Sequence, residues 1–333
     1  MVPPHGGAPG APTFEDIRVD KRALGTSGIS IAPLALGGNV FGWTVDEATS
    51  LSIIDAFVGR GFSLIDTADV YSIWVPGHTG GESERVIGAW LKRGGRRDAV
   101  HIATKVGMNM KAAGQGLSKA HIVAAAEASL RNLGTDTIDL YQAHIDDGTV
   151  PLEETMEAFA RLVEAGKVRA VGASNYTAPR LAEALAASEA KGHPRFSVLQ
   201  PHYNLANRAL FEGELQQLCL REQIGVIPYY ALAAGFLTGK YRRPEDLDGK
   251  ARAGTVAHYL DPRGLDLLAE MDKIAARLGA TLPQVALAWL IAQPAVTAPI
   301  VSATSLAQLD DIMAAPGLTL DAAALSRLDR ASI

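Results

Sequence analysis

The chain has only one cysteine, Cys219, so no disulfide can form within a single molecule. It also lacks an excess of charge, because 31 basic and 36 acidic side chains leave a net charge of −5. That balance gives no electrostatic reason to expect a nucleic-acid or membrane partner. A lone cysteine in a helix-like stretch is typical of a buried thiol in a reducing compartment, so we expect a cytoplasmic protein.

Long hydrophobic runs are missing as well. The nearest approach to a transmembrane run, Val285–Ile300, is interrupted by Gln293, Pro294 and Pro299. The N-terminus has no apolar core of a signal peptide. Residues 1–20 instead contain four prolines and three glycines, which predicts a flexible tail ahead of a single domain at residues 21–333.

Two nucleotide-binding patterns are also absent. No G-x-G-x-x-G follows an early strand-like run, so the usual dinucleotide fingerprint is missing. The segment Gly235–Lys240 resembles a P-loop but is one residue short, and Tyr241 stands where a magnesium-binding Ser or Thr is needed. We therefore exclude a nucleotide triphosphatase. The histidines show no metal-ligand spacing, and we expect no metal site.

What the chain does contain is a regular alternation of short apolar runs and amphipathic helical stretches. Such runs are typical of buried parallel strands, and eight strand–helix units in one domain predict a (β/α)8 barrel. An open, doubly wound sheet is the competing architecture. A small hairpin is expected around Gly25–Gly28, ahead of the first run. The eight predicted strands are Leu34–Gly37, Ser63–Asp66, Val100–Lys105, Ile138–Ala143, Val168–Ala173, Ser197–Gln200, Gly225–Tyr229 and Pro299–Ala303. The predicted helices are Glu47–Arg60, Glu82–Lys92, Lys119–Leu133, Leu152–Ala165, Pro179–Lys191, Leu210–Glu222 and Leu306–Ala314.

Three successive apolar runs end in reactive side chains. Asp66 ends one run and Tyr71 follows it, Lys105 ends the next, and His144 follows the third. Because the carboxyl ends of barrel strands meet at one mouth, we expect these four side chains to converge. Ser174, at the end of the fourth run, should lie beside them.

These residue types suit carbonyl chemistry. A tyrosine is a weak acid, with an ordinary pKa of about 10, and a neighbouring ammonium group is expected to lower that pKa. Lys105 would supply the ammonium group, Asp66 would hold it, and His144 would orient a carbonyl oxygen beside Tyr71. The set predicts a carbonyl reductase that needs no metal, with a nicotinamide supplying the hydride.

Each of these residues, taken alone, has an ordinary structural explanation. A lone Asp caps helices, a lone Lys extends its stem along apolar surface, and a lone His or Tyr packs in a core. Their joint placement at successive strand ends favours catalysis. Trp43 and Trp74 follow the first and second strands, where they would line an apolar substrate pocket or merely pack their loops.

The chain resembles the aldo-keto reductases over nearly all of Arg22–Arg330. The motifs that carry the resemblance are Phe62–Tyr71, Gly81–Glu84, Ala103–Gly107, Asp139–His144, Gly166–Arg169, Gly172–Asn175 and Gln200–Asn204. The resemblance implies a (β/α)8 barrel with extra helices near the C-terminus. It implies Tyr71 as general acid/base, tuned by Lys105 and Asp66, with His144 orienting the substrate.

The same resemblance implies a set of contacts to NADP(H). Ser174, Asn175 and Gln200 would bind the nicotinamide carboxamide, and Tyr229 would stack on the nicotinamide ring. Residues of the following loop would surround the pyrophosphate: Leu232, Gly235, Leu237, Gly239 and Lys240. Residues after the eighth strand would hold the adenosine end: Ser302, Thr304, Gln308 and Asp311.

Two departures from the family pattern stand out. Tyr230-Ala231 occupies the place of the usual Ser-Pro after the stacking tyrosine. No basic residue occurs from Val301 to Leu325, where NADP-preferring members place Lys or Arg around the 2′-phosphate. A phosphate without charge-assisted contacts binds less tightly, so we expect use of both cofactors or a preference for NAD(H).

The sequence thus predicts an aldo-keto reductase that acts on a small carbonyl or alcohol, as a monomer or weak homo-oligomer. One alternative is a cofactor-binding regulatory or redox-sensing subunit of a membrane channel, which shares the fold and turns over little. Another is a dehydrogenase that oxidises a sugar or an alcohol with the same residues. The substrate-facing loops match no pattern that identifies the substrate.

Overall fold

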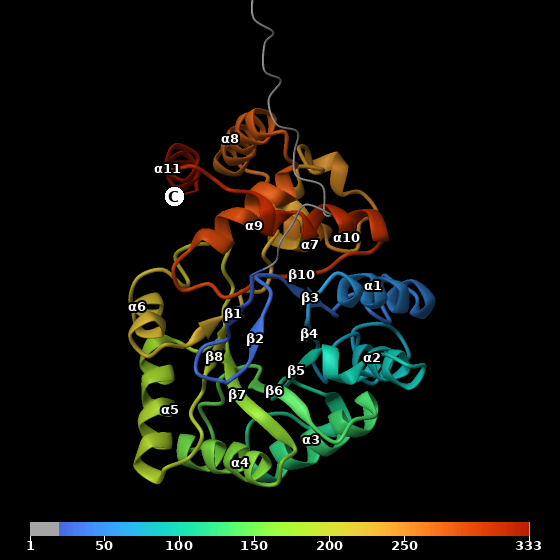
Figure 1. Ribbon diagram of the computed structural model, residues 1–333, viewed down its shortest axis with the longest axis vertical. Coiled ribbons are helices and arrows are strands. Elements are labelled where there is room, and N and C mark those ends of the chain that lie inside the picture. The colour runs from blue at the N-terminus through green and yellow to red at the C-terminus, as the bar shows by residue number, and fades with distance from the viewer. Residues whose placement is uncertain (1–19, 333) are drawn as a thin grey trace, which may run out of the picture.

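Eight short parallel strands form a ring surrounded by helices (Figure 1). The computed structural model describes residues 20–332, so the predicted tail lies outside the described residues except for its last position. Each strand is close to its predicted position. The strands are β3 (Ala35–Gly37), β4 (Leu64–Asp66), β5 (His101–Val106), β6 (Ile138–Ala143), β7 (Val168–Ser174), β8 (Val198–Gln200), β9 (Gly225–Val226) and β10 (Ile300–Val301).

The ring is closed by backbone hydrogen bonds between its two ends. Neighbouring strands follow the order β10-β3-β4-β5-β6-β7-β8-β9. The amide of Ile300 donates to the Pro228 carbonyl at 2.9 Å, and the amide of Thr297 donates to the Val226 carbonyl at 2.8 Å. The first bond joins β10 to the segment after β9, and the second joins the segment before β10 to β9. The predicted (β/α)8 barrel is therefore confirmed, and the open doubly wound sheet is excluded.

The helices form the outer layer and begin and end at sequence signals. The Asp46 carboxylate accepts a hydrogen bond from the Thr49 amide at 2.7 Å and caps the first helix. Gly134, with φ of 63°, ends the third in the left-handed conformation that favours glycine. The helices are α1 (Glu47–Gly59), α2 (Glu82–Lys92), α3 (Lys119–Leu133), α4 (Leu152–Glu164), α5 (Ala178–Lys191), α6 (Glu214–Arg221), α7 (Ala253–Val256), α8 (Pro262–Leu278), α9 (Leu282–Ala292), α10 (Leu306–Met313) and α11 (Ala322–Ala331).

The largest differences from the predicted elements lie between β9 and β10. Three helices that were not predicted individually, α7, α8 and α9, fill this interval. Strand β9 ends at Val226 rather than Tyr229, because Pro228 has no amide hydrogen for the ladder. Among the described residues, no single helix has both the length and the apolar character needed to cross a bilayer. Only α8 and α9 taken together pass such a test, and they meet at a bend of 94°.

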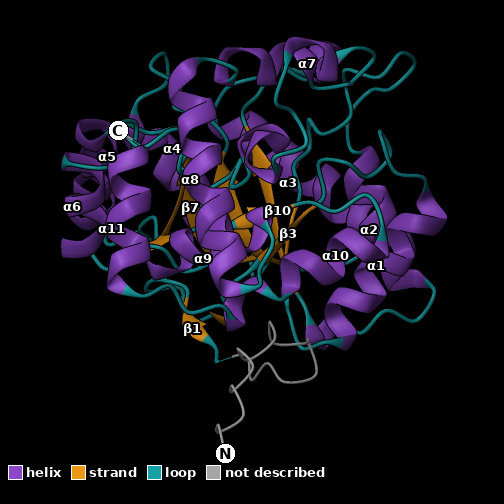
Figure 2. Ribbon diagram, turned by 90° about the horizontal axis from the view of Figure 1, so that it is seen from above, coloured by secondary structure: helices purple, strands orange, loops and turns teal. Residues whose placement is uncertain are grey.

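A two-stranded hairpin closes one end of the barrel. Its strands, β1 (Arg22–Ala23) and β2 (Ser30–Ile31), pair antiparallel, as predicted. Figure 1 shows the hairpin lying across the ring, and Figure 2 shows β1 and α7 at opposite ends of the barrel. Three buried hairpin side chains belong to one apolar cluster with inward-facing strand residues: Leu24, Ile29, Ile31, Leu64, Leu140, Val198 and Ile227. The plugged end leaves the opposite mouth as the place for a site.

The hairpin turn gives a direct test of how tightly this plug fits. A Cβ added to Gly25, whose φ is +54°, would lie 2.1 Å from the Ser197 carbonyl oxygen and 2.4 Å from the Gly225 amide nitrogen. We expect Gly25→Ala to lower the free energy of unfolding by about 2 kcal/mol or more, because backbone must move. The control Gly28→Ala has a similar φ of +73° but open space, and should cost only about 1 kcal/mol. Urea unfolding followed by tryptophan fluorescence measures both, and equal losses would contradict the tight fit.

Candidate active site

The interior of the barrel changes character along its axis. At the end of the barrel near the hairpin, the inward-facing side chains are apolar. Above, the next inward positions are polar: Asp66 of β4, Lys105 of β5, Gln142 of β6 and Gln200 of β8. Because side chains alternate between the two faces of a strand, residues two positions apart both face the barrel interior. On each of these strands one such residue belongs to the apolar layer and the other to the polar layer. Parallel register then sets the polar layer, since Lys105 pairs with Gln142.

Lys105 is the centre of the polar layer. Its side chain is fully buried, and its Nζ donates to Asp66 Oδ2 at 2.8 Å, the Thr67 carbonyl at 2.7 Å and Tyr71 Oη at 2.9 Å. Three donors therefore meet three acceptors. Tyr71 Oη also lies 3.3 Å from Asp66 Oδ2. Asp66, Tyr71 and Lys105 thus form one connected group.

The protonation of this group differs from the expectation for Tyr71. Burial, together with the negative charge of Asp66, raises the pKa of Tyr71 well above its ordinary 10. The net direction is opposite to the one expected for a phenol beside an ammonium group, because desolvation is the largest effect and the Asp66 carboxylate acts in the same direction. Burial lowers the pKa of Lys105 itself, against the opposing effect of Asp66. Tyr71 is consequently a protonated phenol at neutral pH, able to donate its proton.

His144 lies beside the phenol, just beyond the end of β6. Its ring centroid is 6.0 Å from that of Tyr71, and its amide donates to the Val106 carbonyl at 2.8 Å. Burial and the positive charge of Lys105 lower the pKa of His144 well below 6.5, so the ring is neutral at pH 7. Its Nδ1 has no hydrogen-bond partner among residues 20–332. A neutral imidazole at this position can hydrogen-bond to a ligand oxygen.

A cavity of about 1010 Å³ opens above this group. Most of the predicted site residues line it: Asp66, Tyr71, Trp74, His144, Ser174, Asn175, Gln200, Tyr229, Leu232, Gly235, Lys240, Ser302, Thr304, Gln308 and Asp311. Lys105 lies beneath its floor. Leu237 is fully buried in the core, and Gly239 lies closest to Leu282 and Arg242, so neither lines the cavity. Trp43 contacts the lining residue Trp74, with ring centroids 5.3 Å apart.

One side of the cavity carries a connected row of amides. Asn175 Nδ2 donates to the His144 carbonyl at 2.9 Å, and Tyr229 Oη donates to Asn175 Oδ1 at 2.8 Å. Gln200 Nε2 donates to Asp66 Oδ1 at 2.8 Å, which ties this row to the Lys105 group. Asn175 has φ of 58°, a left-handed backbone that positions its amide at the strand end. Donors and acceptors are both available here, as a carboxamide ligand requires.

The far end of the cavity is polar and carries no described cation. Ser302 Oγ donates to Asn39 Oδ1 at 2.6 Å, and the Thr304 amide donates to Gln308 Oε1 at 2.9 Å. Asp311 Oδ1 accepts from Thr281 Oγ1 at 2.7 Å. An anionic group placed here would meet hydroxyls, an amide and a carboxylate.

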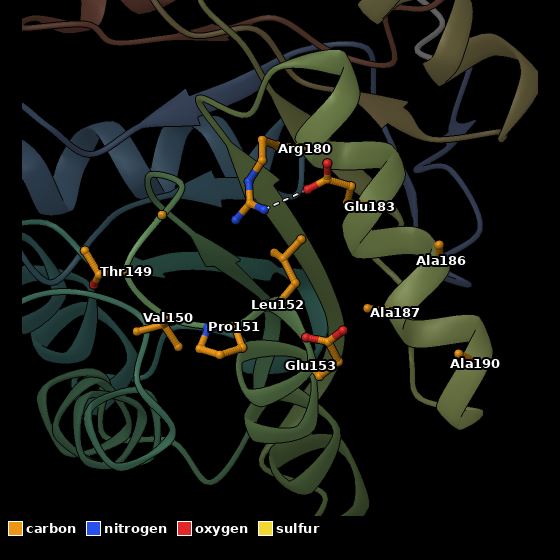
Figure 3. Close-up of a pocket in the computed structure, with 11 residues that line it drawn as sticks. Thr149, Val150, Pro151, Leu152, Glu153, Arg180, Glu183, Ala186, Ala187 and Ala190 are labelled. Carbon is orange, nitrogen blue, oxygen red and sulfur yellow. Dashed lines mark hydrogen bonds and ion pairs between the residues drawn. The ribbon is translucent and has the colours of Figure 1, made fainter.

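A second hollow, of about 680 Å³, lies outside the barrel between the loop before α4 and helix α5 (Figure 3). It is lined by Thr149, Pro151 and small residues of α5 such as Ala187. An ion pair between Arg180 and Glu183, 2.8 Å long, lies at one side of it. None of the predicted site residues takes part.

Comparison with known proteins identifies the family. The sequence model of the aldo/keto reductase family matches residues 33–333. The chain is 33% identical to the aldo-keto reductase YhdN of Bacillus subtilis over 301 residues, covering 89% of this chain and 86% of that protein. It is 35% identical to the aldo-keto reductase dtxS3 of Metarhizium robertsii, covering 92% and 90%. The protein belongs to the aldo-keto reductase family.

A third relative has a different description. The chain is 32% identical to a probable voltage-gated potassium channel subunit beta of Arabidopsis thaliana, covering 88% of this chain and 89% of that protein. The relatives of this chain therefore include proteins described as reductases and a protein described as a channel subunit. The resemblance of the sequence motifs to the aldo-keto reductases, a family of oxidoreductases, is therefore confirmed.

This aldo-keto reductase also has cavity residues that sequence reasoning did not single out as site residues. Lys250 and Arg252 line the cavity from the segment that leads into α7, and Tyr230 and Met108 line it from strand-end loops. The Arg252 guanidinium lies over the Trp43 ring, 5.6 Å from its centroid. Their only signal in the sequence is a charge or a ring in a loop, because loop conformation decides whether such a side chain faces a cavity.

An acidic pair lies buried near the Lys105 group. Burial and the charge of Glu84 raise the pKa of Asp69 to about 8, and Asp69 Oδ1 has no hydrogen-bond partner within the described part of the chain. The unfolded chain, with a carboxyl pKa near 3.8, releases this proton at lower pH than the folded chain does. The Asp69 carboxyl therefore makes its full contribution to the free energy of unfolding below about pH 4, and this contribution is lost as the pH rises through 8.

We expect Asp69→Asn to gain stability over the unsubstituted protein as the pH rises. Between pH 5.5 and 8 the difference should widen by more than about 1.4 kcal/mol, which corresponds to one pKa unit. Urea unfolding at both pH values measures it. Asp139→Asn is the matched control. A hydrogen bond from the Ile102 amide and the guanidinium groups of Arg97 and Arg169 lower the pKa of Asp139 to about 2 despite its burial, so the change in stability should be the same at both pH values. A constant difference for Asp69→Asn would contradict the raised pKa.

Proposed function

We propose that this aldo-keto reductase reduces an aldehyde or ketone to the alcohol with a nicotinamide cofactor. The observation that carries the proposal is the contact of Lys105 Nζ with both Asp66 and Tyr71, beneath a cavity that His144 also faces. This group can donate a proton into the cavity and can stabilise the anion that remains.

The lining residues fit a nicotinamide dinucleotide. Asn175 and Gln200 would hold the carboxamide, and Tyr229 would stack on the nicotinamide ring, supported from behind by His202 at 5.2 Å and 21°. Lys240 and Arg252 would face the pyrophosphate. Gln308 would lie at the adenosine end. A bound reduced nicotinamide would supply the hydride.

The protein residues would control the proton and the substrate. Neutral His144 donates a hydrogen bond that orients the carbonyl oxygen toward Tyr71. Tyr71 donates its proton to that oxygen as negative charge develops there. Lys105 then stabilises the phenolate through its 2.9 Å hydrogen bond, and Asp66 keeps Lys105 in place. The reverse sequence oxidises an alcohol with the same residues.

We also propose that the protein uses NAD(H) as well as NADP(H), or prefers NAD(H). The adenosine end offers Thr304, Gln308 and Asp311, and no Lys or Arg occurs from Val301 to Leu325. A carboxylate repels a 2′-phosphate but accepts a hydrogen bond from a 2′-hydroxyl. Arg60, at the C-terminal cap of α1, is already paired with Asp310.

Replacing Tyr71 tests the proposed reaction. Tyr71→Phe removes the proton donor, so kcat/KM for carbonyl reduction should fall by about 10² to 10⁴ while the cofactor still binds. Turnover and cofactor fluorescence titration measure the two effects. Tyr176→Phe is the control, because the buried Tyr176 hydroxyl has no hydrogen-bond partner among the described residues and does not line the cavity. Full activity of Tyr71→Phe would refute the role, and tight cofactor binding without turnover by the unsubstituted protein would favour a regulatory subunit.

Cofactor preference is tested by comparing kcat/KM for NADPH and NADH. We expect a ratio below about 100, because a missing charge-assisted contact costs about 1.5–3 kcal/mol. Gln308→Arg places a guanidinium at the adenosine end and should raise the ratio about tenfold. Leu306→Arg adds the same charge to α10 at a position outside the cavity and should leave the ratio unchanged. A preference for NADPH above about 100-fold before any substitution would contradict the proposal.

A further inference from the structure

Tyr230 has an unusual backbone conformation at the mouth of the cavity. Its φ is 53°, in the left-handed region that residues with a side chain rarely adopt. Two hydrogen bonds to its carbonyl hold this conformation, from Asn204 Nδ2 at 2.9 Å and from the Ala233 amide at 2.7 Å. A strained residue that is held so firmly beside a site indicates that its side-chain direction matters.

The Tyr230 ring forms one side of the mouth. It is 39% exposed, lines the cavity and packs edge-on against His202 and Tyr229, with centroids 5.5 and 5.3 Å away. These contacts leave a large part of the ring facing open space.

Trp74 forms another side of the mouth. Its ring is 48% exposed, contacts Trp43 at 5.3 Å and lies 6.5 Å from the Tyr71 ring. Tyr230 follows β9 and Trp74 follows β4, strands that are three positions apart around the closed ring. The two side chains therefore reach the cavity from different parts of the ring of strands, and Tyr71 lines the same cavity.

Resting on the proposed reduction, we propose that Tyr230 determines substrate specificity. It and Trp74 are the two walls of a slot that accepts a planar carbonyl compound, an aromatic or conjugated aldehyde or ketone. The flat faces of such a substrate gain ring contacts on both sides, whereas a puckered saturated ring contacts neither wall fully. The oxygen of the substrate points down to Tyr71 and His144.

The test compares kcat/KM for benzaldehyde with that for cyclohexanecarbaldehyde. The two compounds differ in ring planarity and intrinsic reactivity, and the reactivity difference cancels when the ratio is compared between variants. Tyr230→Ser removes the wall and should lower the benzaldehyde-to-cyclohexanecarbaldehyde ratio about tenfold, mainly through the KM for benzaldehyde. Tyr230→Leu keeps the bulk without an aromatic face and should lower it in the same direction. Tyr230→Phe keeps the face and should preserve the ratio.

Leu210→Ser is the control, because Leu210 is 64% exposed and outside the cavity. It should leave the ratio unchanged. Cofactor affinity, from fluorescence titration, should be the same in Tyr230→Phe and the unsubstituted protein. An unchanged benzaldehyde-to-cyclohexanecarbaldehyde ratio in Tyr230→Leu, or in a folded Tyr230→Ser variant, would contradict the proposed slot. If the unsubstituted protein reduces neither aldehyde nor any other carbonyl, the proposed function itself fails, which is a distinguishable result.

Discussion

The site depends on one buried cation. Taking the Lys105 ammonium group out of water is costly, and only well-placed acceptors offset that cost. Asp66, the Thr67 carbonyl and Tyr71 supply three acceptors within 2.9 Å. Their positions follow from the pairing of β4 with β5, in which Asp66 lies opposite Ala103, two residues before Lys105. A shift of that register by one residue would turn Lys105 away from Asp66 and dismantle the site.

Apolar contacts that stabilise the barrel lie at the opposite end from this buried cation. The hairpin fills the opposite end with apolar side chains such as Leu24 and Ile31, so folding does not depend on the polar layer alone. Polar groups then collect at the end where loops supply further contacts. Residues in the left-handed conformation, including Asn175 and Tyr230, also occur in loops at this end, where the surrounding structure must offset the cost of that conformation.

Much of this arrangement was predictable because strand ends are marked in the sequence. Asp66, Lys105 and His144 each close or follow an apolar run, and parallel strands must bring such positions to one mouth. Helix α8 was also within reach, since Asp261 and Gly279 bracket an apolar period, but it was not assigned. The pKa of Tyr71 was not predictable, because it depends on how fully the phenol is buried and on its distance to Asp66. Tyr230 and Arg252 depend on loop conformation, which sequence pattern does not define.

Charge is distributed unevenly along the cavity, and this bears on what it binds. At the floor, Asp66 and Lys105 neutralise each other. Along the loop that leads to α7, Lys240, Lys250 and Arg252 line the cavity, with no ion pair to a described acidic residue. Around Ser302, Thr304 and Gln308 the cavity lining holds no cation among the described residues. A ligand with its negative charge concentrated at its centre fits this pattern better than one with a further charge at its end, because the central charge can form charge-assisted contacts with the cations of that loop. The same charge distribution therefore supports both dinucleotide binding and weak discrimination for a terminal phosphate.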